Sequence, residues 1–327
     1  MEGFPLMSLV ATLLLPVIIN LLVRAVGIVF FRKKFPDAMS LVRELAIMAI
    51  ITAGITLAAG GIMKATGLFE MFFFRPSQKD YGEFGKISHP VTGITIPNGE
   101  LKLDAVMVMP TNQPPEAVVL HLHGSDRNIT HTLRNVAWMA DHGIALVALD
   151  YTGYGKTPGK PSMPALVSDS MAGIRFTQTK KEFAGLPVTV FGQSMGGQLA
   201  IIASALEPTP GLKVISDATY ADPARHLADK MAAMGPLWLF QWVGYLMAPE
   251  SMKAIDHIPK IDGSNLMLIH GLADKVVHPR HGQALAKAAQ PGSIGIFPEN
   301  AGHLRAMDDD AIRKRIIDFV KGKPETP

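Results

Sequence analysis

The sequence lacks cysteine altogether, and charged residues make up only 18% of its 327 positions. Without cysteine the chain can form neither disulfide bonds nor thiolate ligands for a metal, and this absence fits an oxidising or envelope compartment without selecting one. Hydrophobic residues reach 48%, and the mean hydropathy is +0.22. This composition is more apolar than that of an ordinary soluble enzyme, so part of the chain is expected to lie in a membrane.

Phosphate-binding loops, internal repeats and low-complexity tracts are also missing. Gly153, Gly155 and Gly159 fit neither the G-x-G-x-x-G fingerprint nor the P-loop spacing, so nucleotide binding is not expected. The net charge of +3 and the pI of about 9.0 owe much to basic residues beside the N-terminal apolar runs. We interpret this basicity as a membrane-surface feature and not as a nucleic-acid footprint.

Two long apolar runs lie near the N-terminus, at residues 4–31 and 45–63. Each is about as long as a bilayer-crossing helix requires, and residues 45–63 lack the polar face of a helix on a globular protein. Buried helices of a soluble domain are the alternative. A cleaved signal peptide is disfavoured, because nothing basic precedes the first run and that run exceeds the usual apolar core of a signal. We predict a membrane anchor at residues 1–66 with two transmembrane helices.

The basic residues predict how this anchor is oriented. The connection between the two runs carries Arg32, Lys33, Lys34 and Arg43, whereas no lysine or arginine precedes the first run. The positive-inside rule places this connection in the cytoplasm and both termini, with the domain that follows the second run, on the extracytoplasmic side. Further basic residues after the second run weaken the contrast.

Beyond the anchor, short apolar runs alternate with helix-forming stretches, which is typical of parallel βα units. The expected strands are residues 91–96, 101–108, 117–121, 144–150, 188–193, 213–216, 265–270 and 293–297. Asn98-Gly99 predicts that the first two form a β-hairpin with a type I′ turn, which would give the sheet an antiparallel start. The predicted fold class is therefore α/β with a mostly parallel sheet.

The most informative motif is Gly192-Gln193-Ser194-Met195-Gly196, a G-x-S-x-G pattern between a predicted strand and a predicted helix. In a nucleophile elbow the serine stands on a turn so tight that neighbouring side chains would collide with the strand and the helix, and Gly192 and Gly196 remove that bulk. The motif predicts that Ser194 is a nucleophile. The structural alternative is a glycine-rich turn with a helix-capping serine.

A serine nucleophile needs a base and an acid that orients the base, in the chain order serine, acid, histidine. Asp274 follows the predicted strand 265–270, at the end where open α/β sheets place their chemistry, and His303 lies in the loop before the last helix. His303 would take the Ser194 proton while Asp274 holds its tautomer. Alternatively, Asp274 caps a turn and His303 is a surface histidine. His278, in the loop of the acid, is a rival base.

The loop after the predicted strand 117–121 supplies candidates for an oxyanion hole. We assign the donors to the main-chain N–H groups of Ser125 and Met195, with Gly124 allowing the backbone to approach the substrate carbonyl. His121 and His123 lie two apart on one face of a strand, which raises a metal-site alternative, but no third ligand is evident. The favoured interpretation is that His123 packs beside the pocket and hydrogen-bonds the loop backbone.

These motifs resemble those of the α/β-hydrolase superfamily, and within it the small ABHD-type and bacterial membrane-anchored hydrolases. The matching segments are His123-Gly124-Ser125, residues 149–159, the elbow at Ser194, His270-Gly271 with Asp274, and Gly302-His303, which span about residues 90–322. The resemblance implies an eight-stranded, mostly parallel sheet with helices on both faces and a small helical lid. It also implies Ser194, Asp274 and His303 as the triad, with Ser125 and Met195 as oxyanion donors. One departure is Val277-His278-Pro279, where the family often has Val-Pro.

An insertion at about residues 221–262 is where this family often carries a lid. Residues 231–247 within it contain two of the three tryptophans and several methionines. This composition suits an adaptable apolar acyl pocket or a surface that rests on a bilayer. A cap helix that only packs on the core is the equal alternative. A third transmembrane span is disfavoured, because the run is short and is interrupted by Gly235-Pro236.

Residues 67–327 are therefore predicted to form a hydrolase domain tethered to a membrane. We expect cleavage of carboxylic ester or thioester bonds through an acyl-Ser194 intermediate, on a small-molecule acyl ester or lipid-like substrate whose acyl group lies under the lid. No cofactor or metal is expected, because the triad and the oxyanion hole supply the nucleophile, the base and the charge stabilisation. The alternatives are a serine peptidase or amidase on the same fold and a non-catalytic membrane-tethered binding protein.

Overall fold

The computed structural model describes residues 6–31, 37–66, 73–247 and 252–323. It comprises two compact units: Met1–Phe69 with Pro223–Pro249, here called the helical unit, and Glu70–Asp222 with Glu250–Pro327, here called the sheet unit. The structure thus groups part of the predicted lid with the N-terminal segment. The predicted division into residues 1–66 and 67–327 stays a prediction.

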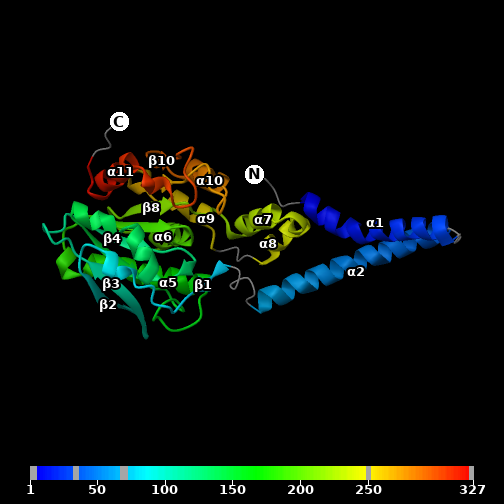
Figure 1. Cartoon of the computed structure of the whole chain (residues 1–327), viewed down its shortest axis with the longest axis horizontal. Helices are drawn as coiled ribbons and strands as arrows, with labels where there is room; N and C mark the ends of the chain where they lie inside the picture. The colour runs from blue at the N-terminus through cyan, green and yellow to red at the C-terminus, as the bar shows by residue number, and fades with distance from the viewer. Residues whose placement is uncertain (1–5, 32–36, 67–72, 248–251, 324–327) are drawn as a thin grey trace. The chain divides into compact units, whose positions relative to one another are not determined.

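The sheet unit contains an eight-stranded sheet in the order β10-β9-β8-β7-β4-β6-β3-β2, with β10 at one edge and β2 at the other (Figure 1). Its strands are β2 (Val91–Asn98), β3 (Leu101–Val108), β4 (Ala117–Leu122), β6 (Ile144–Leu149), β7 (Val188–Gln193), β8 (Lys213–Asp217), β9 (Leu266–Ile269) and β10 (Ile294–Ile296). All neighbouring strands are parallel except β2 with β3 and β3 with β6. The predicted α/β-hydrolase fold is confirmed, and each predicted strand agrees with the structure to within two residues.

The central strands are mostly apolar along their whole length because both faces of the sheet are covered. Every residue of β4 and of β6 is buried. On one face, Val119 of β4 and Leu146 of β6 join a core with Ile316 of α11 (Asp310–Val320). On the other face, a Cβ added to Gly173 of α5 (Met163–Thr179) would come within 3.1 Å of the Leu120 side chain. Strands buried on both faces show no alternation of polar and apolar residues, as is usual for parallel sheets.

Helices and short turns connect these strands. The longer helices besides α5 and α11 are α6 (Met195–Leu206), which follows β7, and α10 (Arg280–Ala288), which follows β9. The shorter ones are η1 (Glu83–Lys86), α4 (Ile129–Thr132), η2 (Leu133–Asn135), η3 (Ala137–His142), η4 (Lys181–Phe183), α9 (Ala254–His257), η6 (Ile258–Lys260), η7 (Gly263–Asn265) and η8 (Ala306–Asp308). A two-residue parallel pair, β1 (Arg75–Pro76) with β5 (Asp126–Arg127), was not predicted, since so short a strand has no periodicity.

The predicted β2–β3 hairpin is confirmed, but its predicted turn type is wrong. The register pairs Asn98 with Leu101, so the two loop residues are Gly99 and Glu100. Gly99 has φ 62°, whereas Glu100 is not among the described residues with positive φ. A type I′ turn needs positive φ at both central residues. A positive φ at the first central residue alone is the type II′ pattern.

The helical unit contains α1 (Leu6–Phe31), α2 (Ala38–Ala65), α7 (Pro223–Ala233), η5 (Gly235–Phe240) and α8 (Gln241–Met247). Within α2, Met39–Ile62 is long and apolar enough to cross a membrane, with a mean hydropathy of 2.1. In α1, Met7–Leu22 is a shorter apolar stretch, and residues 4–5 of the first predicted span lie outside the described residues. The described residues therefore carry one candidate span where the sequence predicts two. Residues 32–34, on which the predicted orientation depends, also lie outside them.

The insertion packs on the N-terminal helices within this unit. The hydroxyl of buried Thr12 in α1 lies 2.9 Å from Ser8 O, is hydrogen-bonded to Leu239 O, and accepts the indole N–H of Trp242 at 3.3 Å. Helix α1 also contacts η5 and α8, and α2 contacts α8. The segment that the sequence predicts as the core of a lid thus shares its packing with the predicted membrane anchor.

Candidate active site

Ser194 occupies a strained turn between β7 and α6. Its backbone has φ 55° and ψ −119°, a conformation that residues other than glycine rarely adopt. A Cβ added to Gly192 would lie 2.0 Å from Gly196 O, and one added to Gly196 would lie 1.9 Å from Leu122 O. The two glycines therefore permit the tight approach that the motif predicts. In the described chain the Ser194 side chain makes no capping hydrogen bond to α6, so the structure gives no support to the helix-cap alternative.

The segment that ends β8 holds this turn. The Ser194 N–H donates to Asp217 O at 2.8 Å, and the Thr219 hydroxyl donates to Ser194 O. A Cβ added to Gly197 would lie 2.6 Å from Ser216 Oγ, so the first turn of α6 sits directly on this segment. Both the N–H and the carbonyl group of Ser194 are thus hydrogen-bonded to the end of β8 and the residues that follow it.

The structure brings Asp274 and His303 together. His303 Nδ1 donates to Asp274 Oδ2 at 2.8 Å, and Asp274 Oδ1 accepts the N–H groups of Val276 at 2.8 Å and Val277 at 3.0 Å. Because Nδ1 carries the proton in this bond, Nε2 is the basic nitrogen of the neutral ring. The Asp274 side chain is fully buried, whereas the His303 side chain is 19% exposed. His303 is therefore held by a buried carboxylate and remains accessible.

Asp274 is kept ionised by its surroundings. Burial would raise the pKa of the Asp274 carboxyl, but hydrogen bonds from His270, His303 and the Val277 N–H outweigh burial and hold the pKa below its ordinary value. His270 Nε2 donates to Val277 O at 3.0 Å and lies 3.4 Å from Asp274 Oδ2. A role for His270 beside the acid is not among the predictions from the sequence. Its position at the end of a predicted strand, four residues before Asp274, is the signal that could have found it.

The rival base His278 is hydrogen-bonded to the start of α10. It is exposed, and its Nδ1 accepts the N–H of Arg280 at 3.2 Å, at the first turn of α10. A ring nitrogen that accepts a backbone N–H is not the one a proton relay needs, so this geometry favours His303 over His278.

The loop after β4 approaches Ser194. A Cβ added to Gly124 would lie 3.5 Å from Ser194 Cβ and 3.6 Å from Gln193 O. Within the part of the chain that the structure describes, the main-chain N–H groups of Ser125 and Met195 donate to no protein acceptor. Met195 begins α6, where the helix dipole places partial positive charge. These positions suit the donors that the sequence predicts, and the donor assignment stays a proposal.

His121 and His123 have separate partners. His121 Nε2 lies 3.4 Å from Gln193 Oε1, and burial lowers the pKa of His121 to about 3, so its ring is neutral. His123 Nδ1 donates to Gly124 O at 2.7 Å, which confirms the predicted bond to the loop backbone. In residues 6–31, 37–66, 73–247 and 252–323 there is no group of three metal-ligating side chains that could hold an ion.

A second buried carboxylate ends β8. Asp217 Oδ2 accepts a hydrogen bond from Gln193 Nε2 at 3.1 Å. Burial raises the pKa of Asp217 to about 6, against the lowering effects of Gln193, His303 and His270. Asp217 is not among the site residues that the sequence predicts. An aspartate directly after an apolar run, at the carboxyl end of a parallel strand, is the signal that marks it.

Backbone strain gathers around these residues. The non-glycine residues with positive φ in the described chain are Arg127, Ser194, Ala218 and Leu304. Arg127 lies two residues after Ser125, and Ala218 and Leu304 directly follow Asp217 and His303. Strained backbone clusters at functional sites because the surrounding structure must hold it there. The described non-glycine residues with strained backbone are therefore Ser194 itself and residues close in sequence to other candidate site residues.

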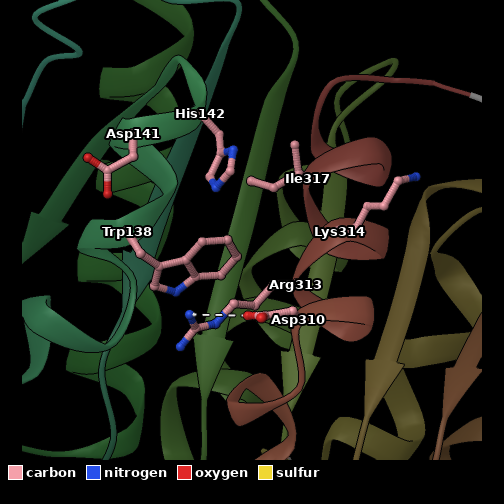
Figure 2. A pocket seen from close by; sticks show the side chains of 7 residues that line it. All are labelled: Trp138, Asp141, His142, Asp310, Arg313, Lys314 and Ile317. Carbon is pink, nitrogen blue, oxygen red and sulfur yellow. Dashed lines mark ion pairs between the residues drawn. The ribbon is translucent and has the colours of Figure 1, made fainter.

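A cavity of about 340 Å³ lies between η3 and α11 (Figure 2). Trp138 and Ile317 line it, and the Arg313 guanidinium sits 5.1 Å from the Trp138 ring centroid and 3.7 Å from Asp310 Oδ1. None of the predicted catalytic or oxyanion residues lines this cavity, and the cations that line it, Arg313 and Lys314, are paired with Asp310 and Asp318. We assign it no role in the chemistry.

Comparisons with known proteins agree with the fold. Residues 113–254 match the family described as serine aminopeptidase, S33. The chain is 27% identical over 257 residues to uncharacterized protein YfhR of Escherichia coli K12, which covers 76% of this chain and 86% of that protein. It is 25% identical over 219 residues to human protein ABHD12B, and this alignment covers 62% of this chain and 60% of ABHD12B. The structure of the Pyrococcus furiosus esterase Pf2001 superposes with a TM-score of 0.63 at 20% identity, covering 77% of this chain and 98% of that one.

The sheet order, the elbow and these relatives together define the class. The chain belongs to the α/β-hydrolase superfamily. Its fold is that of a family of hydrolases, and the bond it cleaves is a separate question, because this fold hosts many chemistries.

Proposed function

We propose that the protein is a membrane-anchored serine hydrolase that cleaves carboxylic ester or thioester bonds through an acyl-Ser194 intermediate. The observation that carries the proposal is the backbone of Ser194, which has φ 55° on a turn that two glycines make possible. Such strain costs about 1–3 kcal/mol and persists where the surroundings enforce it. A simple link between a strand and a helix would place glycine there.

In the proposed reaction Ser194 Oγ attacks the acyl carbonyl carbon while its proton passes to His303 Nε2. Ionised Asp274, bonded to Nδ1, stabilises the imidazolium, and the N–H groups of Ser125 and Met195 bind the oxyanion. Collapse of the tetrahedral intermediate breaks the bond to the alcohol or thiol, which takes the proton from His303. Water then attacks the acyl-enzyme with His303 as base, releasing the acid and restoring Ser194.

The comparisons point to two kinds of bond. Pf2001 is named an esterase, whereas the matched family is described as a serine aminopeptidase. We favour esters and thioesters because the insertion is apolar, with Trp238 and Phe240 exposed at 41% and 40% in the helical unit. Peptide or amide hydrolysis by the same residues is the second candidate. A p-nitrophenyl ester and a p-nitroanilide with the same acyl group separate them, since an equal or faster rate on the anilide would favour the peptidase.

Membrane anchoring rests on the surface of the helical unit. Large apolar side chains are exposed along α1 and α2, among them Met7, Leu22, Met39, Ile50 and Ile62. Contact of such a surface with water is unfavourable by about 25 cal/mol per Å². We propose two spans within residues 1–66, with residues 67–327 and the lid insertion at 221–262 on the extracytoplasmic side. Retention in membranes washed with alkaline carbonate tests the anchor, and digestion by external protease in right-side-out vesicles tests the orientation.

The nucleophile is tested by labelling the full-length protein with a fluorophosphonate probe. Labelling should occur in the wild type and in Ser264→Ala, which removes an exposed serine hydroxyl on η7, and should vanish in Ser194→Ala. A wild type that takes no label, or equal labelling of Ser194→Ala, would rule out Ser194 as the nucleophile. A wild type that takes no label would favour the non-catalytic binding protein, whereas a labelled Ser194→Ala variant would place the nucleophile at another residue.

A further inference from the structure

We propose that Tyr151 and Tyr154 are positioning residues for the oxyanion hole, acting with His123 to hold the backbone of residues 123–125 in its donating orientation. This inference rests on the proposed function and adds to it the device that aims one of its donors. The two tyrosines lie in the loop after β6, within residues 149–159, a segment to which the proposed mechanism gives no role.

Three consecutive carbonyl groups of the loop after β4 are each held by a side chain of this cluster. The Tyr151 hydroxyl donates to His123 O at 2.9 Å. His123 Nδ1 donates to Gly124 O at 2.7 Å, and the Tyr154 hydroxyl donates to Ser125 O at 3.0 Å. Ser125 O has a second donor, the N–H of Arg75, at 2.9 Å. All three acceptors belong to a segment outside the strand and helix ladders, so these bonds set its course.

Holding the carbonyl groups fixes the N–H groups. In a trans peptide the C=O and the following N–H point in opposite directions, and the described chain has no cis peptide bond. The bond from His123 to Gly124 O therefore turns the Ser125 N–H away from the His123 ring. Gly124 lies against Ser194, with an added Cβ 3.5 Å from Ser194 Cβ. A carbonyl bound at Ser194 thus meets an N–H whose direction is already set, which is what oxyanion stabilisation requires.

The cluster is rigid because its rings pack on one another. The His123 ring centroid lies 4.4 Å from that of Tyr151 and 5.2 Å from that of Tyr154, and the two tyrosine rings are 5.7 Å apart at 82°. All three residues are fully buried. Edge-to-face contacts at such distances add about 0.5–1.5 kcal/mol beyond burial. On the other side of the ring, His123 Nε2 lies 3.4 Å from Asp150 Oδ1 without a hydrogen bond, so the contacts that hold the ring are the Nδ1 bond and the two tyrosine rings.

The hydroxyl groups are suited to this role at every working pH. Burial raises the pKa of Tyr151 and of Tyr154 well above that of a free tyrosine. Both therefore remain protonated donors under alkaline assay conditions. Tyr151 takes no other role in the proposed reaction, and neither hydroxyl needs to move during it.

The test uses Tyr151→Phe and Tyr154→Phe in the full-length protein, each of which removes one oxygen and keeps the ring. Kinetics on a p-nitrophenyl ester are paired with inhibition by a trifluoromethyl ketone, which Ser194 converts into a hemiketal carrying an oxyanion. We expect kcat to fall about three- to tenfold for Tyr151→Phe, the effect of one lost hydrogen bond, with KM unchanged. The inhibition constant of the ketone should rise by the same factor. Tyr154→Phe should have the smaller effect, because Arg75 N–H still holds Ser125 O.

The control is Tyr81→Phe, which removes a hydroxyl that donates to Ser77 Oγ and should leave kcat and the ketone affinity unchanged. A role in stability alone would lower Tm without the matched change in kcat and ketone affinity. Unchanged kcat and ketone affinity in both tyrosine variants, while the wild type hydrolyses ester through Ser194, would overturn this inference and leave the proposed function intact. A wild type without Ser194-dependent activity would overturn both. If Tyr151→Phe does not fold, Tyr154→Phe decides: a fall in kcat matched by weaker ketone binding supports the inference, and no change in either overturns it.

Discussion

The carbonyl oxygen of Asp217 accepts the N–H of Ser194 at 2.8 Å, so the end of β8 fixes the backbone of the proposed nucleophile directly after β7. The same residue carries a buried carboxyl group whose pKa burial raises to about 6. One residue thus combines a backbone role in the elbow with a side chain that is unfavourable in its ionised form.

This buried carboxyl predicts a pH-dependent penalty on stability. Its pKa is about 6 in the folded protein and ordinarily 3.8, so the folded state binds the proton more tightly. Below pH 3.8 this group does not lower the free energy of unfolding. The loss of stability grows between pH 3.8 and 6 and reaches its full value of about 3 kcal/mol above pH 6, as follows from the difference between the two pKa values. Asp217→Asn, which can still accept from Gln193, should raise the Tm at pH 7 more than at pH 4. Thermal unfolding at both pH values measures this, and a Tm difference independent of pH would contradict it.

His303→Ala should lower kcat on an ester about 10³-fold or more, because it removes the proposed base. His278→Ala is the matched control, since His278 is exposed and binds the Arg280 N–H instead of the acid. It should retain activity within about twofold, as is usual for a substitution outside the mechanism. The opposite pattern would make His278 the base. Initial rates on one p-nitrophenyl ester, with purified variants of equal Tm, decide between them.

Asp274→Asn should lower kcat about 10⁴-fold while the fold persists. Asparagine can still accept the Val276 and Val277 N–H groups, but a neutral amide no longer stabilises the imidazolium or selects the Nδ1–H tautomer of His303. Circular dichroism should match the wild type. A loss of activity that simply followed a loss of folded protein would mean that Asp274 is structural.

Gly196→Ala should destabilise the sheet unit by about 3 kcal/mol, because its Cβ would lie 1.9 Å from Leu122 O and backbone atoms cannot move aside. Gly85→Ala is the control, since nothing lies within 4 Å of its added Cβ. Urea unfolding measures both. Equal stability of the two variants would show that the elbow can accommodate a Cβ at residue 196, contrary to the structure.

Local sequence predicted most of the fold and the candidate site, because both depend on short-range signals. Strand β6 is an unbroken apolar run, β4 is apolar except for His121, and the five residues from Gly192 to Gly196 form the elbow motif around Ser194. What escaped prediction depends on partners distant in sequence. His270 matters because its ring reaches Asp274 and Val277, and Tyr151 because its hydroxyl reaches a carbonyl on another strand's loop. The position of His270 along the chain marks it as a candidate, but the sequence pattern does not encode the contacts that give it or Tyr151 a role.

The turn type of the β2–β3 hairpin shows the same limit on a smaller scale. Asn98-Gly99 correctly marks a hairpin, but the register places Asn98 in the strand and moves the loop to Gly99-Glu100. A shift of one residue changes which positions need positive φ. The register is set by the packing of β2 and β3, and the dipeptide alone does not contain it.

The helical unit has a practical consequence for handling the protein. Removing only the N-terminal helices, a common route to a water-soluble form of an anchored enzyme, would strip α1 from η5 and α8 and uncover the buried Trp242. Such a shortened protein should aggregate. A soluble form requires that Pro223–Pro249 be excised or made polar together with residues 1–66, so the two segments have to be engineered as one.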